Sequence, residues 1–402
     1  LFFRGLAKNG FFTRLKAAAS AKGTEVDRLN SPWDRFWDMV IDVFAHRKIL
    51  REPYQGAFHL LIFWGFIALI ITTAIVFLQA DFIYPIWHVW FMKDGFYLGL
   101  SLFADVFGGL LIIGLLMALA RRYFIKPKWL DEKGEDSVIL WFILAIVVTG
   151  FIVEALRIQA TEVDPSSPMH PYVWFSPVGR TIAFLFSGMS DAALRDTHVV
   201  LWWTHVLGAL GFIVFIAYSK LLHIFMTPVN IFLRPNTPQP PLKAMPPEMF
   251  ENAETFGIHN IEEFSWKDII DGDACMRCGR CVEVCPAFGT DKPLKPRDVI
   301  QDMRTYVSEK AKLAVDADGK YHIIPDEEYT GPALIGDGIS KDTIWACTTC
   351  MACVEACPAY ILQFPKLIEL RRYMVMMESD FPAEVLDVFK GMENNSNPWS
   401  IG

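Results

Sequence analysis

The sequence predicts a mainly α-helical protein in which a bundle of membrane-spanning helices precedes a soluble helical domain. Three features support this prediction. Four long apolar runs lie within the first 225 of the 402 residues, a proline-rich segment follows them, and all eight cysteines come after that segment. Hydrophobic residues make up 53% of the chain, which is high for a soluble protein, and the net charge of −8 gives no indication of a nucleic-acid partner.

Each of the four apolar runs is long enough to cross a bilayer, which takes about 20 residues. The runs cover 57–79, 95–120, 137–156 and 198–225. Buried core helices are the alternative interpretation. A shorter run at 178–188 cannot span and is expected at the membrane interface. The opening "LFFRGLAKNG" is interpreted as the tail of a hydrophobic helix, so a fifth span is expected before residue 1.

Basic residues predict the orientation of these spans. Residues 1–56 carry ten Lys and Arg and the loop at 121–136 carries five, whereas the loop at 80–94 carries Lys93 alone. Basic loops stay on the cytoplasmic side of a membrane. The sequence therefore predicts a multi-pass protein of the inner (cytoplasmic) membrane, with its cysteines in the cytoplasm.

Seven prolines between 227 and 250 mark a linker. Proline lacks a backbone N–H and has a fixed φ, so this composition is expected to stiffen the chain and to exclude regular helix. The predicted domains are an N-terminal cytoplasmic segment at 1–56, a transmembrane domain at 57–226, the linker at 227–250 and a soluble domain at 251–402.

One cysteine pattern occurs twice, as "CMRCGRCVEVCPAF" at 275–288 and "CTTCMACVEACPAY" at 347–360. C-x2-C-x2-C-x3-C-P is the bacterial ligation run for [4Fe–4S] clusters, and in two-cluster ferredoxins its fourth cysteine serves the other cluster. Structural zinc, the alternative, usually takes two C-x-x-C pairs rather than triplets. The pattern predicts two [4Fe–4S] clusters with crossed ligands: Cys275, Cys278, Cys281 and Cys357 for one, and Cys347, Cys350, Cys353 and Cys285 for the other.

The residues around the two motifs predict a cytoplasmic α-helical ferredoxin-like domain. Helices are expected over 296–311 and 364–378, with a hairpin around Asp318 and Gly319. Two clusters in such a domain carry electrons one at a time and do not themselves transform a substrate.

Three of the nine histidines lie within apolar runs, at His59, His205 and His223. An imidazole in lipid is costly and usually functional. His59 and His223 lie at the cytoplasmic ends of two runs, the arrangement that binds haem iron from both sides. One continuous helix would place His205 and His223 on the same face, about 27 Å apart. Structural histidines with satisfied hydrogen bonds are the alternative.

A resemblance supports the haem. "WWTHVLGALGFIVFIAYSKLLHIFMTPVNIFLR", at 202–234, resembles the last helix of the γ-subunit (cytochrome b) of respiratory nitrate reductase. "AFHLLIFWGFIAL", at 57–69, resembles the helix with the opposing ligands. The resemblance covers about residues 40–234 and implies a haem b between His59 and His223.

The chain departs from that family at one ligand position. The family helix has a second histidine ten residues after the first, whereas this chain has Leu69. A second, outer haem at His205 therefore needs another partner, unless that haem is five-coordinate. His88 is the first candidate, and the weaker ones are His198 and His170.

The soluble part resembles the iron–sulfur region of the heterodisulfide reductase family, through both cysteine motifs and the trailing "ENNSNPWSIG" at 393–402. In that family such a segment leads into cysteine-rich CCG repeats. A membrane cytochrome followed by this domain resembles the fused electron-transfer flavoprotein:menaquinone oxidoreductases. That resemblance implies a cytoplasmic flavoprotein donor and a quinone acceptor, menaquinone or another.

Two carboxyl groups lie within the apolar runs, on Asp105 and Glu154. Buried carboxyls often serve proton relays, so we expect them to protonate a quinone in the outer half of the membrane. Structural pairing is the alternative, for example of Glu154 with Arg157 or of Asp105 with a tryptophan N–H. An outer quinone site would require electrons to cross about 25–30 Å of bilayer, which favours a second haem near His205.

The predicted function is a membrane-bound oxidoreductase that passes electrons between a cytoplasmic donor and membrane quinone. The donor is expected to be an electron-transfer flavoprotein or another flavin subunit. One alternative is a heterodisulfide or thiol–disulfide reductase-type complex. Another is a non-catalytic membrane anchor that conducts electrons for a separate dehydrogenase.

Overall fold

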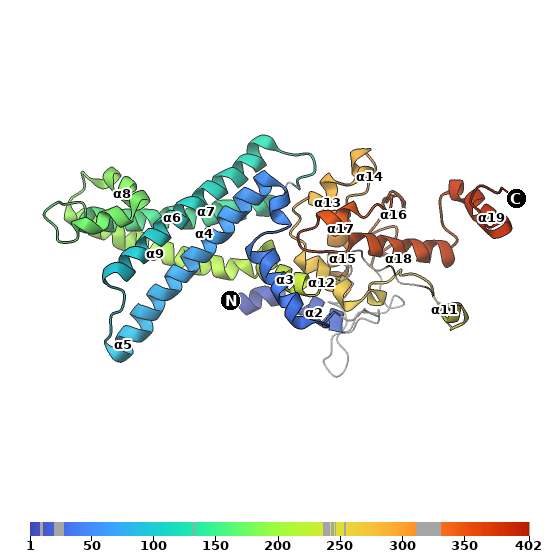
Figure 1. Ribbon diagram of the computed structural model, residues 1–402, viewed down its shortest axis with the longest axis horizontal. Helices are drawn as coiled ribbons and strands as arrows, with labels where there is room; N and C mark the ends of the chain where they lie inside the picture. Colours follow the sequence, from blue (N-terminus) through green and yellow to red (C-terminus); the bar gives the residue numbers. More distant parts are fainter. Residues whose placement is uncertain are drawn as a thin grey trace. The chain divides into compact units, whose positions relative to one another are not determined.

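The computed structural model describes residues 1–8, 11–19, 28–131, 133–235, 242, 245, 247–252, 255–310 and 331–401. These residues form helices and loops, with no strand among them (Figure 1). They fall into two compact units, which we describe separately. The membrane unit is Ile49–Ile216, and the cluster unit combines Leu1–Lys48 with Ala217–Gly402.

The membrane unit contains four long helices joined by short ones. In chain order its elements are η1 (Ile49–Arg51), α4 (Pro53–Phe77), η2 (Leu78–Ile83), α5 (Tyr84–Trp87), α6 (Asp94–Ala120), η3 (Arg121–Ile125), α7 (Gly134–Thr161), η4 (His170–Phe175), α8 (Pro177–Ala183), η5 (Phe184–Phe186) and α9 (Asp191–Ile216).

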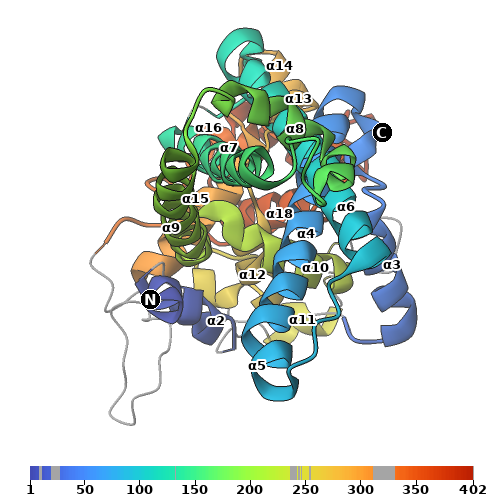
Figure 2. The same cartoon turned by 90° about the vertical axis from the view of Figure 1, so that its left-hand side faces the viewer.

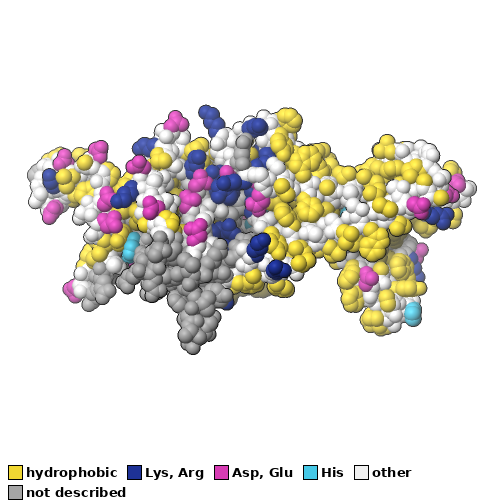
Figure 3. All heavy atoms as spheres, turned by 180° about the vertical axis from the view of Figure 1, so that it is seen from behind, with side chains coloured by type: hydrophobic (Ala, Val, Ile, Leu, Met, Phe, Trp, Pro, Cys, Tyr) yellow, Lys and Arg dark blue, Asp and Glu magenta, His cyan; other side chains and the backbone are white. Residues whose placement is uncertain are grey.

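Four stretches of this unit are long and apolar enough to cross a membrane, which confirms the predicted number of spans. They are Pro53–Trp87, Asp94–Ile125, Gly134–Thr161 and Asp191–Ile216. Hydrophobic side chains cover much of their visible surface, on the right of Figure 3. The apolar stretch expected to be too short to span forms the short helix Pro177–Phe186.

Glycines allow α4 and α6 to approach each other closely, and the two helices lie side by side in Figure 2. A Cβ on Gly65 of α4 would lie 2.6 Å from Leu111 Cβ, and a Cβ on Gly114 of α6 would lie 2.9 Å from Leu61 Cβ. Small residues at such contacts are typical of helix pairs in membranes, where association depends on close packing.

The cluster unit is built from shorter helices. Its elements are α1 (Phe2–Lys8), α2 (Phe11–Ala19), α3 (Pro32–Phe44), η6 (Lys220–Leu222), α10 (His223–Phe232), α11 (Pro247–Asn252), η7 (Ile261–Glu263), α12 (Trp266–Ala274), α13 (Arg280–Glu283), α14 (Pro286–Gly289), α15 (Pro296–Lys310), α16 (Lys341–Trp345), α17 (Ala352–Ala356), α18 (Gln363–Met376), η8 (Ala383–Val385) and α19 (Leu386–Asn395).

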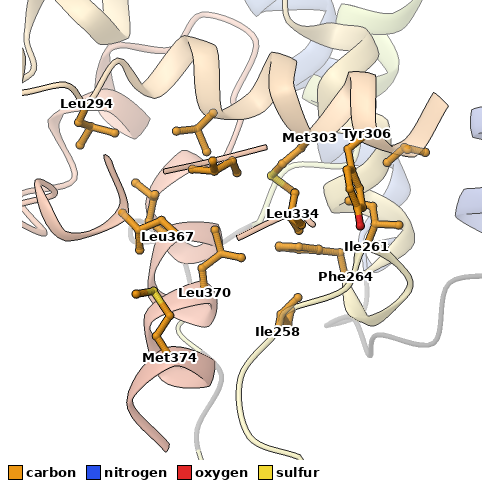
Figure 4. Close-up of a cluster of buried hydrophobic side chains, with 14 of the residues drawn as sticks. Ile258, Ile261, Phe264, Leu294, Met303, Tyr306, Leu334, Leu367, Leu370 and Met374 are labelled. Carbon is orange, nitrogen blue, oxygen red and sulfur yellow. The ribbon is translucent and has the colours of Figure 1, made fainter. Parts of the chain in front are cut away.

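The main core of this unit lies between α12, α15 and α18 (Figure 4). Met303 and Tyr306 of α15 meet Leu367 and Leu370 of α18 within one buried cluster, which Phe264 completes. The two helices expected over 296–311 and 364–378 are therefore confirmed as α15 and α18. The expected hairpin at Asp318 and Gly319 lies outside the described residues.

The prediction that the proline-rich segment excludes regular helix is wrong at its start. Helix α10 continues to Phe232 and contains Pro228. Buried Met226 and Ile231 anchor α10 by packing, which offsets the one backbone bond that the proline removes. A second helix, α11, begins at Pro247, where a proline is tolerated because the first helical N–H has no partner anyway.

A buried ion network links α12 to α18. Lys366 Nζ lies 2.6 Å from both Asp268 Oδ1 and Asp271 Oδ2, and Lys267 Nζ lies 2.6 Å from Asp271 Oδ1. Burial alone would raise the pKa of Asp271, but the two lysines lower it to about 2. This carboxylate therefore stabilises the fold fully above its unfolded pKa of about 4, and the contribution is lost as the pH falls towards 2.

Replacing Lys366 with methionine should lower the free energy of unfolding of the cluster unit by about 3–5 kcal/mol, because two buried carboxylates lose their shared cation. Denaturant titration of the full chain, followed by cluster absorbance, measures this loss. Lys341→Met is the matched control, since Lys341 pairs with Asp380 at the surface, where water screens the pair and its loss should cost far less. Equal losses in the two variants would contradict the prediction.

Candidate functional site

The two cysteine loops share one backbone conformation. In the first loop, Arg277 and Gly279 have φ values of 60° and 85°. At the equivalent positions of the second loop, Thr349 and Met351 have φ values of 57° and 60°. A β-branched residue in the left-handed region is strained, so the second loop keeps the shape of the first at an energetic cost. Strain of this kind is typical of functional sites.

Cys357 lies with the cysteines of the first motif, although it belongs to the second. Burial first, and then the neighbouring Cys278, raise the pKa of Cys357 to about 12. Burial also raises the pKa of Cys281 well above its usual value, and the neighbouring Cys278, Cys275 and Cys357, with Cys353 of the other set, add to this rise. Cys357 also belongs to the buried cluster against which Cys275 packs. The structure thus brings together the four cysteines predicted for one cluster.

The other four cysteines line one cavity of the cluster unit. Its walls include Cys285, Cys347, Cys350 and Cys353, together with apolar residues such as Leu294, Phe364 and Leu367. Within the described ranges no three His, Cys, Asp or Glu side chains converge on a point that could hold a single metal ion. Zinc needs thiolates about 2.3 Å from one ion. Four thiols around a cavity fit a [4Fe–4S] cluster, in which each iron takes one thiolate.

The two cysteine sets differ in their exposure. The difference lies at one position: Cys350 is exposed, as are its neighbours Thr348 and Thr349, whereas its counterpart Cys278 is half-buried. Each set also has two buried cysteines, Cys281 and Cys357 in one and Cys285 and Cys353 in the other. We call the set with Cys350 the exposed set and the set with Cys357 the buried set. Each set also has hydrogen bonds to sulfur, from Thr349 N to Cys347 Sγ at 3.5 Å and from Ile361 N to Cys357 Sγ at 3.4 Å. Exposure and such bonds are two of the properties that set cluster potentials.

In each cysteine set, a cationic side chain lies close to the backbone carbonyl oxygen of one cysteine. Lys48 Nζ lies 3.4 Å from Cys357 O and 4.0 Å from the centroid of the Tyr360 ring. In the other set, Arg371 donates to Cys347 O at 2.6 Å. Positive charge near a cluster favours its reduced, more negative form.

Helix α10 is bonded to the chain on both sides of the buried cysteine set. Asn230 donates from Nδ2 to Ala359 O at 2.8 Å, two residues after Cys357. Thr227 donates to Ala274 O at 3.3 Å, immediately before Cys275. These bonds fix the position of α10, which begins at His223, relative to this cysteine set.

The prediction that His205 and His223 share one helix face is wrong. Helix α9 ends at Ile216, and α10 begins at His223. Ser219 breaks the helix, because its backbone is extended and its side chain accepts a bond from Leu221 N at 3.3 Å. His223 therefore lies beyond the last spanning helix, as part of the cluster unit.

His223 has the hydrogen bond expected of a haem ligand. Its Nδ1 lies 2.9 Å from Lys220 O, and donation to this carbonyl leaves Nε2 for a metal. Burial lowers the pKa of His223, which favours the neutral imidazole that binds iron. His59, the predicted opposite ligand, lies on α4 of the membrane unit with its ring stacked on Phe63. Their pairing stays a prediction.

The two candidates for an outer haem have different surroundings. His205, on α9, has its Nδ1 3.1 Å from Thr149 Oγ1, and its ring lies against Gly150 of α7. His88 follows α5 and is exposed, with its ring against Tyr84. A hydrogen bond at Nδ1 again leaves Nε2 of His205 for iron. The pairing of His205 with His88 stays a prediction.

The two carboxyl groups have different contacts. Asp105 is 1% exposed and accepts bonds from Val178 N at 2.9 Å and Gly179 N at 2.8 Å, so it caps the start of α8. The Glu154 carboxyl packs on the same Gly179, where a Cβ would lie 2.9 Å from Glu154 Cδ. Arg157 is paired with Glu162. The Asp105 carboxylate is thus paired with backbone amides rather than with a tryptophan N–H, and a proton-transfer role for either carboxyl group stays a prediction.

Sequence reasoning did not identify Lys48 or Asn230 as neighbours of a cluster site. Lys48 lies 309 residues from Cys357, and Asn230 lies 129 residues from Ala359. Neither residue belongs to a motif. The basic character of residues 1–56 was the one available signal, and it indicated orientation only.

Two families match the chain. Residues 56–238 match the nitrate reductase gamma subunit family, and residues 271–361 match the 4Fe-4S dicluster domain. The first match covers the spanning helices with His59, His205 and His223, and the second covers both cysteine motifs. No solved structure matches.

Several curated proteins are similar along the chain. "EtfAB:quinone oxidoreductase" of Syntrophomonas wolfei is 36% identical over 98% of this chain and 56% of its own length. "Probable iron-sulfur-binding oxidoreductase FadF" of Bacillus subtilis is 28% identical over 93% of this chain and 54% of its own length. One component of the dihydromethanophenazine:CoB–CoM heterodisulfide reductase of Methanosarcina barkeri is 25% identical over 48% of this chain and 64% of its own length.

The chain spans about half the length of the first two relatives. All three are named as oxidoreductases or as parts of one. This chain joins a membrane domain of the nitrate reductase gamma subunit family, residues 56–238, to a 4Fe-4S dicluster domain, residues 271–361.

Proposed function

We propose that the protein is a membrane-bound oxidoreductase that passes electrons from a cytoplasmic flavoprotein to membrane quinone. The observation that carries this proposal is the bonding of α10, with His223 at its start, to both sides of the Cys275 and Cys357 set. The relative named as an EtfAB:quinone oxidoreductase supports the choice of donor and acceptor.

The cysteines and histidines would hold the redox groups. The sets of Cys275, Cys278, Cys281 and Cys357 and of Cys347, Cys350, Cys353 and Cys285 would each bind one [4Fe–4S] cluster, and His223 with His59 would bind haem b. When bound, these groups supply one-electron carriers between a flavin and a quinone, which both exchange two electrons.

The surroundings of the two cysteine sets suggest the order in which electrons would pass through them. The exposed set at Cys350 is accessible to a donor protein, because an electron must cross only a short gap when the partners dock there. The buried set is the one joined to α10 by Asn230 and Thr227. From Thr227 to His223 is one helical turn, about 6 Å along the axis.

Glu154 is the better candidate for supplying a proton to quinone. Asp105 already accepts two backbone bonds that fix α8, whereas the Glu154 carboxyl packs on Gly179 at the same helix start. A carboxyl group within a spanning segment is a common feature of proton relays. Under the proposed orientation, with the cluster unit in the cytoplasm, this group lies in the outer half of the membrane.

The proposal is tested by mixing reduced electron-transfer flavoprotein with the full chain and menaquinone in nanodiscs. We expect the flavoprotein to reduce haem b and then menaquinone. In Glu154→Gln, haem reduction should persist while menaquinone turnover falls about tenfold or more and loses its pH dependence. Asp105→Asn, the matched control, should lower stability without changing that pH profile.

Two outcomes would overturn parts of this proposal. If dithionite reduces the haem but no flavoprotein does, the donor is wrong and the route is unaffected. If Glu154→Gln retains wild-type menaquinone turnover and pH profile, the proton route through Glu154 is wrong, whatever the result for Asp105→Asn.

A further inference from the structure

Helix α3, Pro32–Phe44, has one strongly apolar face that is open to solvent. Trp33, Phe36, Trp37 and Ile41 are 66%, 40%, 47% and 44% exposed. Their spacing of three, one and four residues places them on one side of a helix. The three aromatic rings also pack on one another, with centroids 5.6–5.8 Å apart.

The opposite face of α3 is fixed to the cluster unit. Arg35 is 3% exposed and donates to Phe232 O at 3.1 Å, at the end of α10. Asp42 is 4% exposed and accepts bonds from Arg234 at 2.6 Å and Tyr360 Oη at 2.8 Å. The helix cannot roll to hide its aromatic side chains without breaking these buried bonds.

A short tether connects α3 to a membrane span. Eight residues, 45–52, separate the end of α3 from Pro53, where α4 begins. A chain of this length reaches at most about 28 Å. The aromatic face is therefore restricted to the neighbourhood of a bilayer surface, whichever side of the membrane the cluster unit occupies.

Helix α10 provides a second, independent observation. It packs against α3 and begins seven residues after the end of α9, the last spanning helix. Its outward side chains are also apolar, with Ile224, Phe225 and Val229 being 37%, 53% and 44% exposed, while Asn230 on the other side is fully buried. Two packed helices, each joined to a different span, thus have a buried polar face and an open apolar face.

We infer that α3 and α10 rest in the interfacial layer of the bilayer, with Trp33, Phe36 and Trp37 inserted among the lipid headgroups and upper acyl chains. Helices with aromatic residues on one face and a polar opposite face bind in this layer, where tryptophan is favoured. The occupant of the apolar face is a phospholipid surface rather than a protein. This contact would hold α10, and with it the Cys275 and Cys357 set, at the membrane surface.

Photo-crosslinking of the full chain in nanodiscs of phosphatidylethanolamine and phosphatidylglycerol tests the inference. Benzoyl-phenylalanine at Phe36 should form an adduct with the mass of one phospholipid. The same group at Met392 of α19, which is 51% exposed, should form none and is the matched control. An adduct at Phe36 with a polypeptide, an equal lipid yield at Met392, or no lipid adduct at Phe36 would each overturn the inference.

A charge variant tests whether the aromatic face itself makes the lipid contact. In Trp33→Glu/Trp37→Glu, the lipid adduct at Phe36 should fall about tenfold or more, because carboxylates do not partition into the interface. Cluster paramagnetic signals should stay unchanged, which shows that the unit is folded. Met392→Glu should change neither. An undiminished lipid adduct in the double variant would contradict the inference.

Discussion

Replacing Cys278 and Cys357 together with alanine should leave one intact [4Fe–4S] cluster per chain. These cysteines come from different motifs but lie in the same buried set, so the double variant removes two thiolates from one cluster and none from the other. We therefore expect about four irons and four acid-labile sulfides per chain in place of about eight. The reduced protein should keep the paramagnetic signal of the exposed cluster.

The matched variant is Cys278→Ala/Cys285→Ala, which changes two cysteines of the same motif. With crossed ligands each cluster loses one thiolate, so no complete [4Fe–4S] signal should remain. Ligands that stay within one motif would give the reverse pattern, with the Cys278/Cys285 variant keeping a cluster and the Cys278/Cys357 variant keeping none. The pair of variants thus distinguishes the two arrangements without depending on activity.

Replacing His223 with leucine should remove one haem b per chain while leaving both clusters in place. The side chain is held by Lys220 O at Nδ1, and leucine keeps its bulk without a metal-binding nitrogen. Haem is counted as the pyridine haemochrome, and the clusters by their iron, sulfide and paramagnetic signals. Electron transfer to menaquinone should fall by about two orders of magnitude or more, since one-electron transfer to quinone needs a carrier in the membrane.

His259→Leu is the control for this variant. His259 belongs to the same unit, stacks on Tyr373 and pairs with Glu263, and it lies outside the apolar runs. Its replacement should leave the haem content unchanged. Full haem content in His223→Leu would show that other residues bind the haem iron. It would contradict the proposed electron route from the Cys275 and Cys357 set through α10 to the haem.

Most of the architecture follows from local patterns that the sequence contains. A span needs only a long apolar run, so hydropathy predicts α4, α6, α7 and α9 without knowledge of their neighbours. The spacing of the cysteines within each motif is also a local feature, so each motif predicts a cluster-binding loop without knowledge of its neighbours. The shared backbone of the two loops, including the strained Thr349, shows that both copies specify one shape.

The remainder depends on interactions between residues far apart in the chain. The interruption between His205 and His223 lies where α9 ends at Ile216 and the chain becomes extended at Ser219, and hydropathy does not register such a break. The position of α10 depends on Asn230 and Thr227 meeting carbonyls beside distant cysteines. The role of Asp105 likewise depends on the amides at the start of α8, 73 and 74 residues further on.

The rate of haem reduction in Cys278→Ala/Cys357→Ala tests most directly whether electrons reach the haem through the buried cysteine set. The variant is mixed with reduced flavoprotein, and the haem absorbance and the paramagnetic signal of the remaining cluster are followed after rapid mixing. We expect the exposed cluster to become reduced while the haem stays oxidised. Haem reduction at the wild-type rate would contradict the proposed route.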